Sequence, residues 1–130
     1  VPKYIFHPPK AKLPLYPTNV KPIKGRVILV EGIYDVINLH DKGLTNALCC
    51  FGTHNINEQK LQLLKMRGVE QVDIIFDPDT AGQNAVEKVK ELCDKVLLKH
   101  HSVKLSGDIK IDPGALSESA VQGLKEQLYA

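Results

Sequence analysis

Short apolar runs alternate with amphipathic stretches along most of the chain. Apolar runs predict four buried strands, at 27–30, 47–51, 72–76 (broken only by Asp73) and 96–98. Residues 103–105 are a further short candidate. Helical spacing of apolar positions predicts the intervening helices, from 33 to about 43, from 57 to about 68, after residue 79, and over 117–128. The pattern is that of a βαβαβαβ unit with a helical tail.

Local signals mark where several of these helices begin and end. Asn57 is a good N-cap residue, and Ile56 and Leu61 are spaced as a hydrophobic staple around it. Gly43 and Gly68 follow the first and second helical patterns, where a glycine commonly ends a helix.

The last two helices present apolar positions on one face. In the helix after residue 79, the positions predicted to face inward are Ala81, Ala85, Val86, Val89 and Cys93. In the final helix they are Ala120, Val121, Leu124 and Leu128.

Strands that alternate with helices predict an α/β fold with a doubly wound, parallel sheet flanked by helices. If the first and third strands are neighbours, the strand order is 2-1-3-4. The switch point, where ligands bind in such sheets, then lies between these two strands.

Residues 1–24 differ from the rest and are expected to be an arm or linker from an upstream subdomain, leaving 25–130 as the domain. They hold six of the eight prolines, so they are expected to be extended or irregular. Residues 1–26 also carry six basic and no acidic residues, which leaves 11 Lys and Arg against 15 Asp and Glu. A basic arm is equally consistent with contact to a polyanion and with a solvated linker.

Composition places the chain among ordinary globular domains, at 43% hydrophobic and 25% charged residues. No apolar stretch approaches the roughly 20 residues that span a bilayer. The three cysteines, Cys49, Cys50 and Cys93, form no CxxC pair, which argues against a zinc ribbon and fits a reducing, cytoplasmic location. We expect the chain to be a piece of a longer protein.

Carboxylates follow two of the predicted strands. Glu31 ends the first strand, and Asp77 and Asp79 end the third. Asp35, four residues after Glu31, is placed to face the same crevice. Clustered carboxylates repel unless a cation compensates, and Mg²⁺ favours such oxygen ligands. Structural roles remain open for each acid taken alone, as a helix cap for Asp79, as a helix-dipole partner for Asp77 and as a surface turn for Glu31.

The residues around these acids resemble motifs of the Toprim (topoisomerase–primase) domain. The segment 30–36, with Glu31, Gly32 and Asp35, is similar to the EGxxD glutamate motif of DnaG-type bacterial primases. The segment 76–82, with Asp77 and Asp79, resembles the DxD motif with its primase-type continuation. Residues 50–53 resemble the glycine-threonine loop between them.

The resemblance implies a Rossmann-like Toprim sheet and a set of residue roles. Glu31 would be a general acid/base or metal ligand, Asp77 and Asp79 would hold Mg²⁺ or Mn²⁺, and Asp35 would support a metal. Gly52 and Thr53 would approach nucleotide or nucleic acid, with Lys21, Lys24 and Arg26 as weaker candidates from the arm. Asp112 resembles the first acid of a further DPD-like pair, but the second acid is replaced by Gly114, which puts a third metal site in doubt.

The function implied is that of a DNA primase core, which joins ribonucleoside triphosphates on a single-stranded DNA template, with a replicative helicase as a candidate partner. One alternative is a Toprim nuclease of the OLD or ribonuclease M5 type. Another is a non-catalytic Toprim binding module. A receiver-like domain fits poorly, because its acids and late lysine follow a different order.

Overall fold

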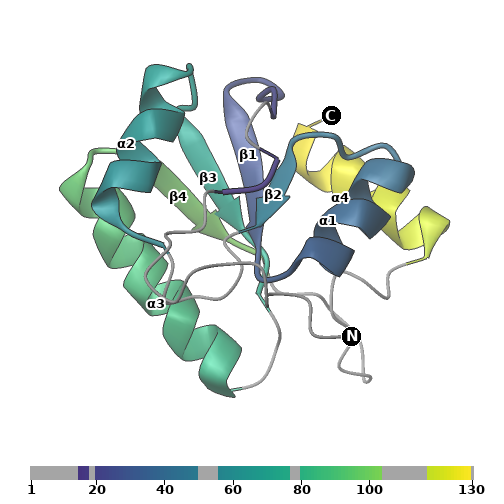
Figure 1. The fold of residues 1–130 in the computed structure, drawn as a ribbon. Coiled ribbons are helices and arrows are strands. Elements are labelled where there is room, and N and C mark those ends of the chain that lie inside the picture. Colours follow the sequence, from purple (N-terminus) through teal and green to yellow (C-terminus); the bar gives the residue numbers. More distant parts are fainter. Residues whose placement is uncertain (1–14, 18–19, 50–55, 77–79, 104–116, 130) are drawn as a thin grey trace, which may run out of the picture.

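A computed structural model describes residues 15–17, 20–49, 56–76, 80–103 and 117–129. In these described ranges, four strands alternate with four helices (Figure 1). Their bounds are β1 Arg26–Val30, α1 Ile33–Asp41, β2 Ala47–Cys49, α2 Glu58–Met66, β3 Gln71–Ile74, α3 Thr80–Lys95, β4 Lys99–Ser102 and α4 Glu118–Tyr129. None of the helices in the described part of the chain combines the length and the apolar character that crossing a bilayer requires.

The sheet is parallel with the order β2-β1-β3-β4, which confirms the predicted arrangement. In the register, Leu29 of β1 pairs with Leu48 of β2 on one side and with Ile74 of β3 on the other. β1 therefore lies inside the sheet, and its carboxyl end opens between β2 and β3.

Helices cover both faces of the sheet (Figure 1). Val27 and Leu29 of β1 belong to the core beneath α2 and α3, whereas Ile28 and Val30 belong to the core beneath α1 and α4. This division follows from the period of two along a strand, which sends successive side chains to opposite faces. Because both faces are covered, β1 is almost wholly apolar, as the sequence predicts.

The fourth strand is not where the apolar pattern predicted it. β4 spans Lys99–Ser102, and the predicted run 96–98 instead forms the turn after α3, where the Val96 N–H donates to the Leu92 carbonyl at 3.3 Å. Val96 and Leu98 are buried against the core, so their hydrophobicity reflects a helix end and not a strand. Val103, in the candidate strand 103–105, continues the pairing by donating to the Ile74 carbonyl at 2.9 Å.

Two alanines predicted to face inward are exposed. Ala81 lies in the first turn of α3, and Ala120 lies in the first turn of α4. The other inward positions of these helices are buried as predicted, with Cys93, Val89 and Val121 fully enclosed. A small apolar side chain carries a weak burial signal, so alanine misleads most at helix ends.

Part of the proline-rich arm packs against the domain. Leu15 and Val20 are buried in the core on the α2 and α3 side. Tyr16 forms an isolated antiparallel bridge to Cys49, with N–H···O distances of 3.0 and 2.8 Å. This bridge covers part of the outer edge of β2, which is an edge strand of the sheet.

The predicted N-cap of α2 is confirmed, and it allows a first prediction. The Asn57 side-chain oxygen accepts a hydrogen bond from the Lys60 N–H at 2.9 Å. Replacing Asn57 by alanine is expected to lower the free energy of unfolding by about 1 kcal/mol, measured by urea denaturation. As a control, Asn84→Ala within α3, where that side chain is exposed, should be neutral or slightly stabilising. Equal losses in both variants would contradict the capping role.

A second prediction concerns Cys93, a buried free thiol of α3. Burial, reinforced by the negative charge of Asp94, raises the pKa of Cys93 from 9.0 to about 12. Above pH 9 the unfolded chain releases this proton while the folded protein retains it, so the free energy of unfolding should fall. The expected loss is about 1.4 kcal/mol per pH unit above the ordinary thiol pKa.

Urea denaturation between pH 8 and pH 11 tests this expectation against a Cys93→Ala variant. The variant should be less stable at neutral pH, because the substitution leaves a cavity, yet it should lose less stability as pH rises. An identical pH dependence in both proteins would contradict the assignment.

Candidate functional site

Glu31 directly follows the central strand β1 and is half-buried. The register that pairs Leu29 with Ile74 continues for one more residue, because the Ile75 N–H donates to the Leu29 carbonyl at 3.0 Å. One further step puts Glu31 level with Phe76, which is buried. The glutamate therefore lies at the carboxyl edge of the sheet, beside the end of β3.

Asp35 occupies the third position of α1, and its carboxylate turns back toward the start of the helix. Its Oδ2 atom accepts a hydrogen bond from the Gly32 N–H at 3.3 Å. Gly32 is the N-cap, with an extended backbone. Since Gly32 joins Glu31 to the helix, this hydrogen bond holds the Asp35 carboxylate beside the same short connection that carries Glu31.

The remaining predicted acids lie outside the described residues. Asp77 and Asp79 follow Phe76 directly in the chain, and Asp112 falls in the segment 104–116. Gly52 and Thr53 of the predicted glycine-threonine loop also fall outside. Within the described ranges, no group of three or more His, Cys, Asp or Glu residues is close enough to hold a metal.

Comparison with known proteins identifies the family. Residues 28–113, which include Glu31 and Asp35, match the family described as Toprim-like. The chain belongs to this family. The family assignment and the parallel sheet agree with the resemblance drawn from the motifs at 30–36 and 76–82.

Relatives of this Toprim-like chain include bacterial primases. A segment of 61 residues is 37% identical to a DNA primase of Deinococcus radiodurans and covers 47% of this chain and 10% of that protein. The Aquifex aeolicus primase structure, with zinc-binding and RNA polymerase domains, matches with a TM-score of 0.68 at 26% identity, over 79% of this chain and 25% of that one.

A structure of a DnaG primase catalytic domain bound to single-stranded DNA matches with a TM-score of 0.65 at 27% identity. The match covers 84% of this chain and 35% of that chain. The Toprim-like chain thus spans between a tenth and about a third of the length of these three proteins.

The carboxylates in the described part of the carboxyl edge of the sheet are suited to bind a hard divalent cation. Glu31 and Asp35 both offer carboxylate oxygens, which are the ligands that Mg²⁺ and Mn²⁺ favour. Both follow β1 within five residues, so they reach the edge from one short segment.

The three basic candidates do not gather at this edge. Arg26 begins β1, at the amino edge of the sheet, and it forms a bidentate ion pair with Asp73 at 2.9 and 3.1 Å. The Lys24 ammonium donates to the Tyr129 carbonyl at 2.7 Å. Lys21 is exposed and lines a hollow beside α1.

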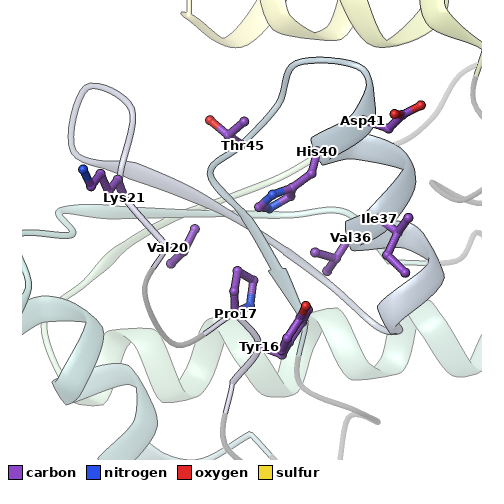
Figure 2. Close-up of a pocket in the computed structure, with 9 residues that line it drawn as sticks. All are labelled: Tyr16, Pro17, Val20, Lys21, Val36, Ile37, His40, Asp41 and Thr45. Carbon is purple, nitrogen blue, oxygen red and sulfur yellow. The ribbon is translucent and has the colours of Figure 1, made fainter.

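This hollow has a volume of about 660 Å³ and lies between the arm and α1, on the flank of β2. Figure 2 shows Tyr16 and Pro17 on the arm side, with Val36 and Ile37 on the helix side. The His40 ring points across it toward β2, where its Nε2 atom lies 2.8 Å from the Ala47 carbonyl oxygen. Because a carbonyl only accepts, His40 donates here, which fixes the Nε2–H tautomer.

Sequence reasoning missed a polar network at the amino edge, whose centre is Asp73. Asp73 is fully buried in β3 and, besides Arg26, accepts hydrogen bonds from Gln71 and from the Tyr129 hydroxyl, each at 3.0 Å. Asn46 donates to the Tyr129 hydroxyl at 2.7 Å. The signal in the sequence was Asp73 itself, a charged residue inside an apolar strand. Such a residue needs hydrogen-bonding partners when it is buried.

The same network fastens α4 to the sheet. Arg26 donates to the Leu128 carbonyl at 2.9 Å, and its guanidinium lies 5.4 Å from the centre of the Tyr129 ring. The hydrogen bond to Asp73 raises the pKa of Arg26, against the effect of burial. Burial raises the pKa of Tyr129, and the negative charge of Asp73 adds to the effect. Arg26 is therefore held charged and Tyr129 neutral, and the network supports the fold at the edge opposite Glu31.

Proposed function

We propose that this Toprim domain is the catalytic core of a DNA primase, which carries out metal-dependent nucleotidyl transfer on single-stranded DNA. The observation that carries the proposal is the position of Glu31, at the carboxyl end of the central strand and level with the end of β3. Ligands of parallel α/β sheets bind at this edge, at the switch point of the strand order. The similarity to primases supports the choice of chemistry.

In this proposal the acids at the carboxyl edge of the sheet have different roles. The Glu31 carboxylate accepts the proton of an attacking 3′-hydroxyl or binds the cation. Asp77 and Asp79 would hold Mg²⁺ or Mn²⁺, with Asp35 in support and Asp112 as a weaker candidate. A bound divalent cation would neutralise the phosphate oxygens during displacement of pyrophosphate.

Nucleic-acid contact is proposed from a different set of residues. Gly52 and Thr53 would approach the nucleotide, and Lys21 is the arm residue best placed to attract phosphate, because it is exposed and lines the open hollow beside α1. Lys24 and Arg26 are weaker candidates, since both already hydrogen-bond α4. The related DnaG domain that binds single-stranded DNA supports a DNA template for this chain.

Incubation with labelled single-stranded DNA, ribonucleoside triphosphates and Mn²⁺ tests the proposal. Primase chemistry yields new RNA that grows on the template, nuclease chemistry shortens the DNA, and a binding module only retains it. The assay should use the full-length protein alongside this chain, because template grip can come from other domains. RNA synthesis by the full-length protein that survives Glu31→Gln would overturn the assignment, whereas Glu87→Gln on exposed α3 surface should leave it unchanged.

A further inference from the structure

Among the described residues, α1, α2 and α3 end with the same backbone motif but not with the same residue. α1 and α2 end through Gly43 and Gly68, whose φ angles are +102° and +96°. At the end of α3 the corresponding residue is Leu97, with a φ of +62°, and the Leu98 N–H closes the motif on the Cys93 carbonyl at 2.9 Å. Leu97 thus occupies, after α3, the position that a glycine occupies after α1 and α2.

Leucine is unfavourable at this position for two separate reasons. Its Cβ atom disfavours the left-handed backbone conformation, which glycine adopts freely. In addition, 81% of Leu97 is exposed, so burial within the chain does not offset the strain. Departures from local preference of this kind concentrate at functional surfaces.

Leu97 stands between two hollows at the amino edge of the sheet. One, of about 470 Å³, includes Gly68, Val69 and Glu70 in its lining, and the other, of about 530 Å³, includes Gln71, Asp94 and His100. Leu97, Leu98 and Lys99 line both. A protruding apolar side chain therefore lies directly beside cavities of a size that could receive one.

Charges of both signs surround Leu97. The lining of the hollows includes the cations Lys65 and Lys99 and the anions Glu70 and Asp94. The Lys65 ammonium donates to the Val96 carbonyl at 3.0 Å, which ties the end of α2 to the end of α3. Met66, 83% exposed, follows Lys65 and adds apolar surface at the end of α2.

We propose that this surface, termed the Leu97 surface and made of residues 65–71 and 94–100, binds a second copy of the chain about a two-fold axis. In a two-fold interface the same patch must complement itself. A projecting leucine beside a hollow meets this requirement, because each Leu97 can enter the hollow of the other copy. Mixed charges meet it as well, because each copy offers both a cation and an anion. A partner whose surface carried charges of one sign only would place like charges against half of the charged groups of this surface.

Sedimentation velocity of the chain, from micromolar to low-millimolar concentration, tests this proposal. We expect concentration-dependent dimers and at least about tenfold weaker association for Leu97→Gly. The same substitution should raise the melting temperature of the monomer at low concentration, because glycine relieves the backbone strain. Leu63→Ala is the matched control, since Leu63 is a leucine of α2 that is 56% exposed and lines neither hollow.

Each other outcome overturns the proposal. A chain that stays monomeric over the whole range has no such interface, and association that Leu97→Gly leaves unchanged uses another surface. Equal weakening by Leu97→Gly and Leu63→Ala would indicate non-specific apolar contact. A lower melting temperature of the Leu97→Gly monomer would show that Leu97 supports its own fold. None of these results depends on the catalytic role of Glu31.

Discussion

Replacing Asp73 by alanine is expected to lower the free energy of unfolding by about 3 kcal/mol. The substitution removes the acceptor that Arg26, Gln71 and the Tyr129 hydroxyl share, and it leaves their donors without a partner in or near the core. We place the loss at the lower end of the range for buried ion pairs, because the Arg26 side chain is 24% exposed and water can reach it.

Urea denaturation with a second, milder variant makes this test specific. Tyr129→Phe removes the hydrogen bonds of the hydroxyl with Asp73 and Asn46 but leaves the bidentate pair with Arg26, so the expected loss is about 1–2 kcal/mol. As a control, Asp94→Ala removes a carboxylate that is 72% exposed and should change stability by less than about 0.5 kcal/mol. A loss for Asp73→Ala no greater than that of Asp94→Ala would show that the network does not hold the fold.

Local signals explain why most of the architecture could be predicted. Asn57, Gly43 and Gly68 act within one turn of their own helices, so their roles follow from short stretches of sequence. The strand order 2-1-3-4 was predicted on the condition that the first and third strands are neighbours, and the pairing of β1 with β3 meets this condition. The helix caps and ends depend on local sequence spacing, whereas the strand order depends on which strands pair.

The features that could not be predicted depend on contacts between distant residues. Asp73 bonds Tyr129, which lies 56 positions later, and Tyr129 bonds Asn46, which lies 83 positions earlier. No local pattern joins these three. The end of α3 was misread for a different reason, because Leu97 occupies a position where glycine would have signalled the stop. Apolar residues at a helix end then resembled a strand.

The candidate site could likewise be predicted only in part. Glu31 could be predicted, because an acid directly after a buried strand must lie at the carboxyl edge of a parallel sheet. The hydrogen bond from Gly32 to Asp35 could not, because it depends on the side-chain rotamer of Asp35 at the helix start. That bond gives Asp35 a structural role beside its proposed role in metal binding, and the two roles can be separated by experiment.

Replacing Glu31 by glutamine is expected to weaken Mn²⁺ binding at least about 100-fold, measured by calorimetric titration or by paramagnetic broadening of NMR signals. The estimate is a lower bound, because changes in groups that only support a ligand already cost about 10–100-fold in metal affinity. Glutamine keeps the size of the side chain, so the circular dichroism spectrum and melting temperature should not change. Glu87→Gln, on the exposed face of α3, should bind Mn²⁺ as the parent does.

Asp35→Asn divides the two roles of Asp35, because an asparagine oxygen can still accept the hydrogen bond from the Gly32 N–H while the charge is lost. If Asp35 supports the cation, this variant should keep its stability but bind Mn²⁺ more weakly than the parent. Unchanged Mn²⁺ binding would leave Asp35 as a helix-capping residue only.

Full Mn²⁺ affinity in Glu31→Gln, with or without a nucleoside triphosphate present, would remove Glu31 from the metal site. The position of Glu31 at the switch point would then be explained by its role as a general acid/base or by the fold alone.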